Sequence, residues 1–190
     1  MFQRILAACC ALTLVAAGAY GRPYSETFDG PLRSSVWSVR NATAPNAITT
    51  ANGRLRVTVG VDQLVFPWDA AKTTAPMLLL EPPRDDDQFT LETHVQVMQP
   101  AGGMWKLMVG LALIRKDGAA AWIWGMLDVD EVALREHDMI RIGKAAWNNI
   151  GAADAAWLQL AKDGDQYTFR HKLRTDDEWI ETTARPFGVA

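Results

Sequence analysis

The stretch from Trp157 to Thr182 constrains the fold of this chain more than any other feature. Apolar and polar residues alternate along it, and two turn sequences, Asp163-Gly164 and Thr175-Asp176-Asp177, interrupt the alternation. Aspartate followed by glycine favours a tight hairpin, because glycine adopts the positive φ that a two-residue β-turn demands. The stretch therefore predicts three short strands joined by two turns, and an all-β protein.

The same alternation predicts strands through the rest of the chain. Asn52-Gly53 predicts a second tight hairpin. No amphipathic helix longer than a turn or two is predicted, and Val132–Asp138 is the one segment that is ambiguous between helix and strand. Strands 107–115 and 120–127 are apolar on both faces, which places them at the centre of a sheet. Short strands with glycine turns predict two packed antiparallel sheets, a sandwich or jelly roll, in one domain. The remaining predicted strands are 24–28, 48–50, 55–59, 77–80, 89–97 and 139–144.

The first 21 residues have the composition of a secretory signal peptide. Arg4 is followed by the apolar run Ile5–Ala17, which is too short to span a bilayer, and then by Ala19-Tyr20-Gly21 with small residues at −3 and −1. We expect cleavage near Gly21, residues 1–21 outside the fold, a mature domain of residues 22–190, and a secreted or periplasmic location. The alternative is a lipoprotein signal with the motif Leu6-Ala7-Ala8-Cys9, which leaves only about five residues before the motif and almost no apolar region.

Composition excludes several classes of function for the mature domain. Both cysteines, Cys9 and Cys10, lie in the predicted signal, so we expect no disulfide and no thiol chemistry. The net charge of the chain is −3, and loss of Arg4 makes it −3 − 1 = −4. A mildly acidic chain without a basic stripe is a poor nucleic-acid binder. No apolar run beyond the signal approaches the length that spans a membrane.

Four passages in this order resemble a known family. They are Glu26–Gly30 followed by Trp37, then Ala75–Leu80, then Phe89–Val95, and finally Trp157–Leu160 continued through Asp163-Gly164 to Trp179. The chain is similar to concanavalin A-like jelly rolls, and most similar to the lectin-like domains at the C-terminus of family 43 β-xylosidases and their stand-alone secreted relatives, a domain of unknown function. Such domains close with another strand after a segment like 186–189. Because this chain stops at Ala190, we expect either a truncated sequence or a sheet that lacks its last strand, with an exposed edge.

The strongest catalytic candidate is the acidic sequence that runs from Met126 to Glu131. Family 16 glycoside hydrolases, which share the jelly roll, carry nucleophile, helper aspartate and acid/base on one strand as Glu-Ile-Asp-x-x-Glu. Asp128 and Glu131 match that pattern, but Met126 stands at the nucleophile position. Retaining hydrolysis needs two carboxyl groups about 5 Å apart. We therefore expect no catalytic residue here, and a coincidental acidic turn or a site that has lost its chemistry.

Metal and histidine chemistry is weakly indicated. Asp85–Asp87 and the acidic group Asp128, Asp130 and Glu131 could supply oxygen ligands to Ca²⁺, joined by Glu26 or Asp29, although an acidic loop is usually a solvated turn. We therefore expect no cofactor, with calcium as the alternative. The three histidines, His94, His137 and His171, are scattered and flanked by charge, and we expect them on the solvated surface.

Eight tryptophans are the best ligand-binding candidates, because a sugar stacks on an aromatic face. We expect Trp37, Trp157 and Trp179 in the core. Trp122 and Trp124 share one face of their strand, which is either the core between the sheets or an open concave surface. Trp68, Trp105 and Trp147 lie in predicted loops, where binding residues concentrate, and either contact ligand or cap the core. The predicted ligand-binding set is Trp68, Asp69, Trp105, Trp124, Asp128, Trp147 and Asn148.

These patterns predict a secreted, non-catalytic module that binds an oligosaccharide or polysaccharide through loop aromatics and polar side chains. One alternative is a jelly-roll glycoside hydrolase or polysaccharide lyase, which paired carboxylates about 5 to 9 Å apart in one groove would favour. The other is a structural β-sandwich whose open edge strand accepts a partner chain.

Overall fold

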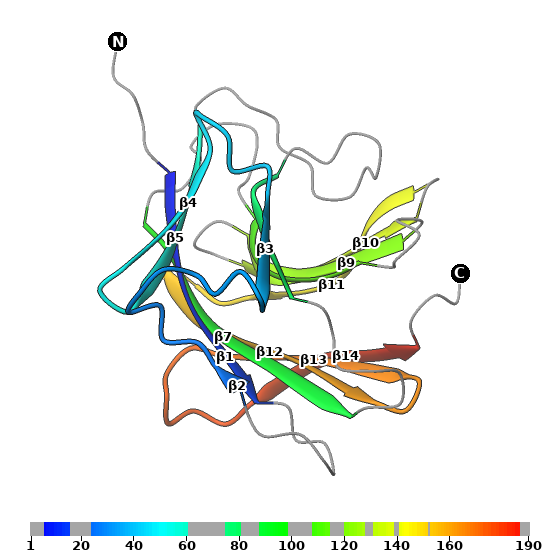
Figure 1. Cartoon of the computed structure of the whole chain (residues 1–190). Coiled ribbons are helices and arrows are strands. Elements are labelled where there is room, and N and C mark those ends of the chain that lie inside the picture. The colour runs from blue at the N-terminus through cyan, green and yellow to red at the C-terminus, as the bar shows by residue number, and fades with distance from the viewer. Residues whose placement is uncertain are drawn as a thin grey trace.

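The computed structural model is an all-β, two-sheet antiparallel β-sandwich, and it describes residues 6–15, 24–60, 75–80, 88–98, 108–114, 120–127, 131–138, 141–151 and 153–186 (Figure 1). Within these ranges there is no helix, and every strand pairing is antiparallel. The fold class predicted from the alternation is therefore confirmed at the level of the sandwich.

The larger sheet has the strand order β14-β13-β12-β7-β1-β5-β4, with β2 paired to β1. Its last three strands form the meander that the Trp157–Thr182 stretch predicts, and β12 continues the sheet by pairing with β7. Its strands are β1 (Leu6–Val15), β2 (Tyr24–Ser25), β4 (Ala47–Ala51), β5 (Arg54–Val59), β7 (Phe89–Val97), β12 (Ala155–Asp163), β13 (Gln166–Lys172) and β14 (Ile180–Pro186).

The smaller sheet is a meander of four strands in the order β11-β10-β9-β8, and it forms the second layer (Figure 1). A separate pair, β3 and β6, aligns Trp37 with Leu80. The strands are β3 (Trp37–Arg40), β6 (Met77–Leu80), β8 (Met108–Ile114), β9 (Ala120–Leu127), β10 (Glu131–Asp138) and β11 (Arg141–Asn149).

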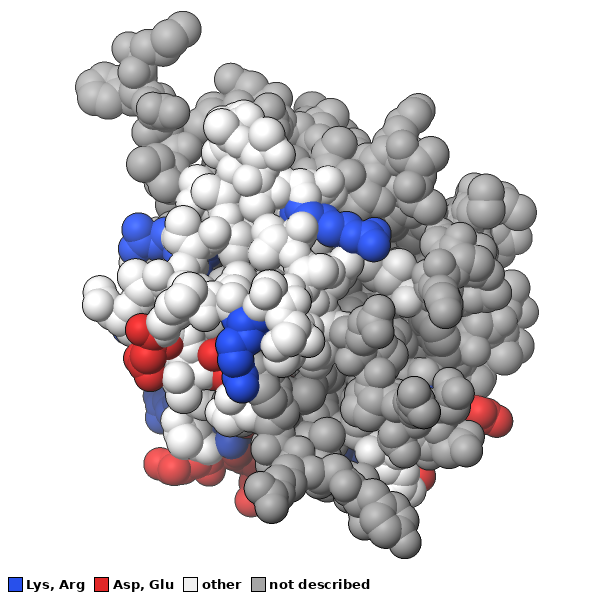
Figure 2. Space-filling model, viewed as in Figure 1, with Lys and Arg blue, Asp and Glu red and all other residues white. Residues whose placement is uncertain are grey.

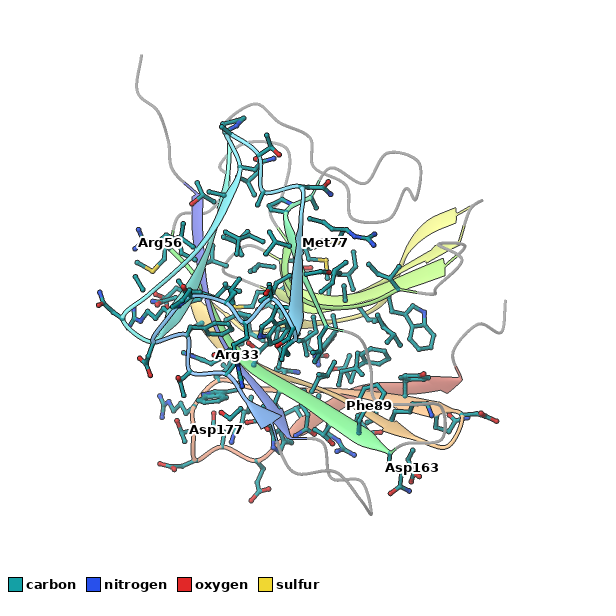
Figure 3. All side chains as sticks on the ribbon, viewed as in Figure 1. Arg33, Arg56, Met77, Phe89, Asp163 and Asp177 are labelled. Atoms are coloured by element: carbon teal, nitrogen blue, oxygen red, sulfur yellow. The ribbon has the colours of Figure 1, made fainter. Side chains whose placement is uncertain are left out.

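The core lies between the two sheets and is built from alternate residues of their strands (Figure 3). Along β7 the side chains of Phe89, Thr93, Val95 and Val97 are buried, whereas the residues between them are only partly covered. β12 and β13 bury alternate residues in the same way. This period of two is the one that the sequence shows, and it directs one face of the large sheet toward β8 and β9, whereas the described side chains of the other face remain partly exposed.

Both predicted glycine hairpins form, and the first of them has the turn residues that its sequence predicts. Asn52 and Gly53 link β4 to β5 with φ of 52° and 70°, so both central residues are left-handed, as a type I′ turn requires. Between β12 and β13 the pair Asp163–Gln166 closes a loop of Gly164 and Asp165, and of these two only Gly164, at 56°, has positive φ. That pattern fits a type II′ turn, one residue later than predicted.

Several strand boundaries differ from the predictions. The first predicted strand, 24–28, ends at Ser25, and Phe28, with a φ of 55°, is not extended. The ambiguous patch at 132–138 belongs to the full strand β10, and the strand predicted at 139–144 runs from Arg141 to Asn149. Strand 120–127 is interior and is buried on both faces from Trp122 to Leu127, as predicted.

The prediction that β8 is central is wrong. β8 is the edge of the smaller sheet within the described ranges, and of its side chains only Leu111 is buried. The strand tolerates this edge position although its sequence is apolar, because Gly110 and Ala112 expose little apolar surface. Ile114 remains 37% exposed.

Part of the segment 1–21, which is predicted to be cleaved and to lie outside the mature domain, takes a place in the large sheet of the uncut chain. Leu6–Val15 forms β1, which pairs with β5 on one side and with β7 on the other. An extended apolar segment of ten residues can satisfy its backbone hydrogen bonds on both edges there, and this is why the sheet accommodates it.

Candidate functional site

The predicted ligand-binding residues are not brought together in the described part of the chain. Trp68, Asp69, Trp105 and Asp128 lie outside the described residues, as do Asp85–Asp87 and Asp130. Trp147 was predicted in a loop, and the structure places it in strand β11 instead, where its backbone alone is described. Trp124 and Asn148 are the two members of the set whose side chains can be placed.

Trp124 belongs to the core and cannot offer a ring face to a ligand. Its side chain is fully buried, and its ring lies 6.0 Å from that of Phe169, centroid to centroid. Its indole N–H donates a hydrogen bond of 2.9 Å to the carbonyl oxygen of Arg170. Trp122 is buried on the same face and meets Tyr167 and Phe169 edge-on, so this face of β9 packs between the sheets and is not an open concave surface.

Asn148 takes part in a polar chain that connects the two sheets. Its Nδ2 donates to Thr182 Oγ1 at 3.0 Å, and that hydroxyl lies 3.4 Å from Nδ1 of His171. Because β11 and β14 belong to different sheets, these hydrogen bonds connect the two sheets. The amide of Asn148 is engaged in that contact.

His171 is 1% exposed, which corrects the expectation of a solvated surface histidine. It occupies an inward position of β13, and its ring centroid lies 6.0 Å from that of Trp124. Burial lowers the pKa of His171 below its ordinary value of 6.5, so the ring is held neutral at pH 7. His137 lies in β10, and its side chain is outside the described residues.

The first position of the family 16 pattern, Met126, lies in the core. Met126 is fully buried, so the residue in the nucleophile position packs into the core between the sheets. Glu26, considered above as a calcium ligand, accepts hydrogen bonds from Trp37 Nε1 at 3.0 Å and from Arg33 at 3.4 Å (Figure 3 labels Arg33). Within the described ranges no three histidine, cysteine or acidic side chains gather as a metal-binding group.

The outer face of the large sheet carries a row of aromatic and basic side chains, called here the aromatic row: His94, Trp157, Lys172 and Trp179. The first three are direct cross-strand partners on β7, β12 and β13. The rings of His94 and Trp157 stack with centroids 4.8 Å apart, and Lys172 Nζ lies 5.9 Å from the Trp157 centroid and 4.9 Å from that of Trp179. All four side chains are partly exposed.

A second row runs beside the first on the same face, called here the polar row: Glu92, Gln159, Arg170 and Glu181. Gln159 Nε2 donates to Glu92 at 3.3 Å and Arg170 Nη1 donates to Gln159 at 3.2 Å, while Arg170 Nε and Nη2 reach Glu181 at 3.3 and 3.2 Å. Each member lies two residues along its strand from the aromatic row, a separation of about 6.5 to 7 Å. Polar donors and acceptors thus flank the rings.

The two rows together carry two basic side chains, Arg170 and Lys172, and two acidic ones, Glu92 and Glu181. Burial, and to a lesser degree the charge of Arg54, lowers the pKa of His94, while Asp154 opposes the shift. A neutral imidazole stacks on the Trp157 indole without carrying charge, so Lys172 is the cation of the aromatic row. On the face seen in Figure 2, the basic side chains of the described residues are scattered and do not form one stripe.

Trp157 and Trp179 were expected in the core, and the structure places both on the outer face. The signal that could have found them was present: Trp157 lies one position from Leu158 and Ala156, and these two fill the core positions of β12. Trp37, in contrast, is 4% exposed and lies in the core as expected.

Comparison of the chain with models of known protein families gave no match, and comparison with curated proteins gave none either. The described ranges contain no helix with the length and hydropathy needed to cross a bilayer.

Proposed function

We propose that this protein is an exported, non-catalytic carbohydrate-binding module of concanavalin A-like type. The observation that carries the proposal is the aromatic row, in which Trp157 and Trp179 remain partly exposed on the outer face of the large sheet with Lys172 between them. Sugars bind proteins through C–H contacts with aromatic rings combined with hydrogen bonds to a few oriented polar groups.

The polar row supplies the second requirement. Glu92, Gln159 and Arg170 are already oriented by their hydrogen bonds to one another, so little side-chain entropy is lost when a hydroxyl group binds them. The partial exposure of the row leaves carboxylate and guanidinium groups accessible, with Arg170 37% and Glu181 50% exposed. A glycan that lies across β12 and β13 would contact both rows.

The loop tryptophans extend the proposal. Trp68, Asp69, Trp105, Asp128 and Trp147 remain candidate contacts, and a long polysaccharide could engage these residues and the sheet face together. Substitutions in the two regions separate the two sites.

The test is binding of the purified protein to a panel of soluble plant, algal and bacterial polysaccharides, followed by tryptophan fluorescence and affinity electrophoresis, with and without Ca²⁺. We expect a saturable response that Trp157→Ala or Trp179→Ala weakens by about tenfold, the equivalent of about 1.4 kcal/mol. Val39→Ala on β3 is the matched control, because Val39 is also exposed, at 47%, and lies outside both rows.

The outcomes discriminate among the sites. Loss of binding in Trp68→Ala or Trp105→Ala, with the row variants unaffected, would move the site to the loops. Absence of saturable binding by the folded protein across the whole panel would reject the carbohydrate-binding function. Release of reducing ends from a bound polysaccharide would favour the glycoside hydrolase instead.

The proposed export has a separate test. When the chain is expressed with its first residues intact, we expect the mass of the exported protein to correspond to a new N-terminus near Arg22. A lipid-modified N-terminus at Cys9 would instead support the lipoprotein alternative.

A further inference from the structure

The large sheet contains a position between β5 and β7 that β1 fills. β1 pairs with β5 from Leu6↔Val59 to Cys10↔Leu55, and with β7 from Ala8↔Val97 to Val15↔Thr90. In the described ranges, the β4–β5 hairpin is joined to the rest of the sheet only through β1. Without β1, two strands would present open hydrogen-bonding edges toward each other.

The neighbours of β1 define what a strand in this position must look like. Directly opposed residues of antiparallel strands share a face, so each β1 position can be assigned from its partners. Cys10 is opposite the buried Leu55 and Val95, and Leu12 is opposite Thr93, which is 1% exposed. The residues of β5 and β7 that lie opposite positions 8, 10, 12 and 14 are thus on the core side of the sheet, and these four positions are called core-facing for that reason.

The intervening positions have polar partners. Cys9 is opposite Arg56 and Gln96, and Thr13 is opposite Glu92, all on the outer face. The position therefore selects an extended segment with small or branched apolar residues at alternate places, and it tolerates polar residues between them. Because the selection depends on backbone pairing and alternate side chains, it does not require the sequence of β1 itself.

The segment that fills the position is also the apolar part of the proposed signal peptide. A cut near Gly21 would end the covalent connection between β1 and β2, and the contacts of β1 with β5 and β7 would become those between two separate polypeptides. We infer that the position between β5 and β7 is a strand-acceptor site: after the N-terminal segment is cut from the domain, it binds an extended apolar strand of another polypeptide, antiparallel to β5 and β7.

The site shares β7 with the two carbohydrate rows, but the inference does not depend on sugar binding, and it rests on the proposed cleavage only for its occurrence in the cell. The experiment therefore uses the full chain with a protease recognition sequence inserted between Gly21 and Arg22. The chain is folded and purified in reducing buffer and then cut, and a dye-labelled peptide with the sequence of residues 6–15 is added. We expect the labelled peptide to replace the cut segment, with saturable fluorescence anisotropy and co-elution with the domain.

Two peptides that receive the same residue at adjacent positions test the register. Leu12→Lys places a charge at a core-facing position and should weaken binding by at least about tenfold. Thr13→Lys places it opposite Glu92 on the outer face and should change binding by less than about threefold. The inference would be overturned if the two substitutions weakened binding equally, or if Leu12→Lys did not weaken it.

The same pair of substitutions within the full chain covers the case in which the cut segment does not exchange. After the cut, the Leu12→Lys segment should separate from the domain on gel filtration, whereas the Thr13→Lys segment should remain bound. The proposal would be rejected if the cut segment separated from the domain in both variants, and if the domain then kept its stability and bound no peptide.

Discussion

At the scale of single residues, the contact of Glu26 with the buried indole of Trp37 has the clearest energetic consequence. Oε2 of Glu26 accepts the indole N–H at 3.0 Å, and the same oxygen receives Arg33 at 3.4 Å. The indole is almost fully covered, whereas the side chain of Arg33 is 55% exposed. The first contact is therefore protected from water and the second is not.

We expect Glu26→Ala to lower the free energy of unfolding by about 1 to 3 kcal/mol, because a buried donor loses this acceptor. Arg33→Ala is the matched control and should cost at most about 1 kcal/mol, since exposed ion pairs contribute little. Urea denaturation followed by tryptophan fluorescence measures both values. An equal loss in the two variants would show that the ion pair, not the indole contact, dominates.

His171 makes the stability of the fold depend on pH. Burial lowers its pKa in the folded state below the ordinary value of 6.5, so the unfolded chain binds the proton more tightly. Stability is therefore fully present above pH 6.5 and falls as the pH drops from 6.5 through the folded-state pKa, below which both states are protonated. His94, whose pKa is also lowered, adds to the same loss.

We expect His171→Gln to flatten the dependence of the denaturation midpoint on pH between about 7 and 5, whatever its effect on stability at pH 8. His94→Gln should flatten it too, because burial also lowers the pKa of His94. The comparison rests on slopes, which a uniform loss of packing does not change. An unaltered slope in His171→Gln would contradict the assignment.

The residue scale also shows what the sequence could predict of the site. Alternation in β12 separates Trp157 from Leu158 and groups Leu158 with Ala156 and Leu160, but the resemblance to related domains, which bury an aromatic residue at this place, led to the wrong prediction for Trp157. The decisive information was the burial of Ala156, Leu158 and Leu160 opposite the smaller sheet. The contact of Asn148 with Thr182 joins residues 34 positions apart, and no local pattern could predict it.

At the scale of elements, β8 and β9 approach each other closely where two glycines face. Gly110 and Gly125 are direct cross-strand partners. A Cβ built at Gly110 would lie 2.2 Å from the carbonyl oxygen of Trp124, and one built at Gly125 would lie 2.3 Å from that of Val109. Backbone atoms cannot move aside as a flexible side chain can, so these glycines are required by space.

We expect Gly125→Ala to destabilise the protein by about 3 kcal/mol, the upper end of the usual cost of overpacking. Gly110→Ala should cost less, because β8 is an edge strand of the described sheet and can shift outward. Gly164→Ala is the control: nothing lies within 4 Å of its Cβ position, and its φ of 56° should cost only about 1 kcal/mol. Chemical denaturation ranks the three, and a larger loss at Gly164 than at Gly125 would contradict the packing argument.

Elements were predicted well where a turn sequence and an alternating pattern agreed, as in β4–β5 and β12–β13. They were predicted poorly where tertiary context decided. The apolar sequence of β8 is compatible with an interior or an edge position. The described sheet decides between them, because β8 pairs there with β9 and with no second strand. The segment Leu6–Val15 has the composition of a signal peptide and of a buried strand at once, and its place in the sheet follows from the open edges of β5 and β7.

At the scale of the whole molecule, β1 joins the N-terminal hairpin to the C-terminal meander and makes β7 an interior strand. Alternate amides of β7 point to β1 and to β12, because the two neighbours pair with opposite edges of the same strand. With both neighbours in place, the amides of both sets are hydrogen-bonded. An edge strand, in contrast, leaves every second amide open to water.

We therefore expect hydrogen exchange of the full chain, followed by NMR, to show continuous protection from Thr90 to Gln96. β8 provides the control within the same molecule: it pairs only with β9 in the described sheet and should show fast exchange at every second amide. A pattern of alternate protection in β7 like that in β8 would mean that β1 leaves its place in solution, and the strand-acceptor site would then be open even in the uncut chain. Continuous protection would establish β1 as the strand that holds the two halves of the large sheet together.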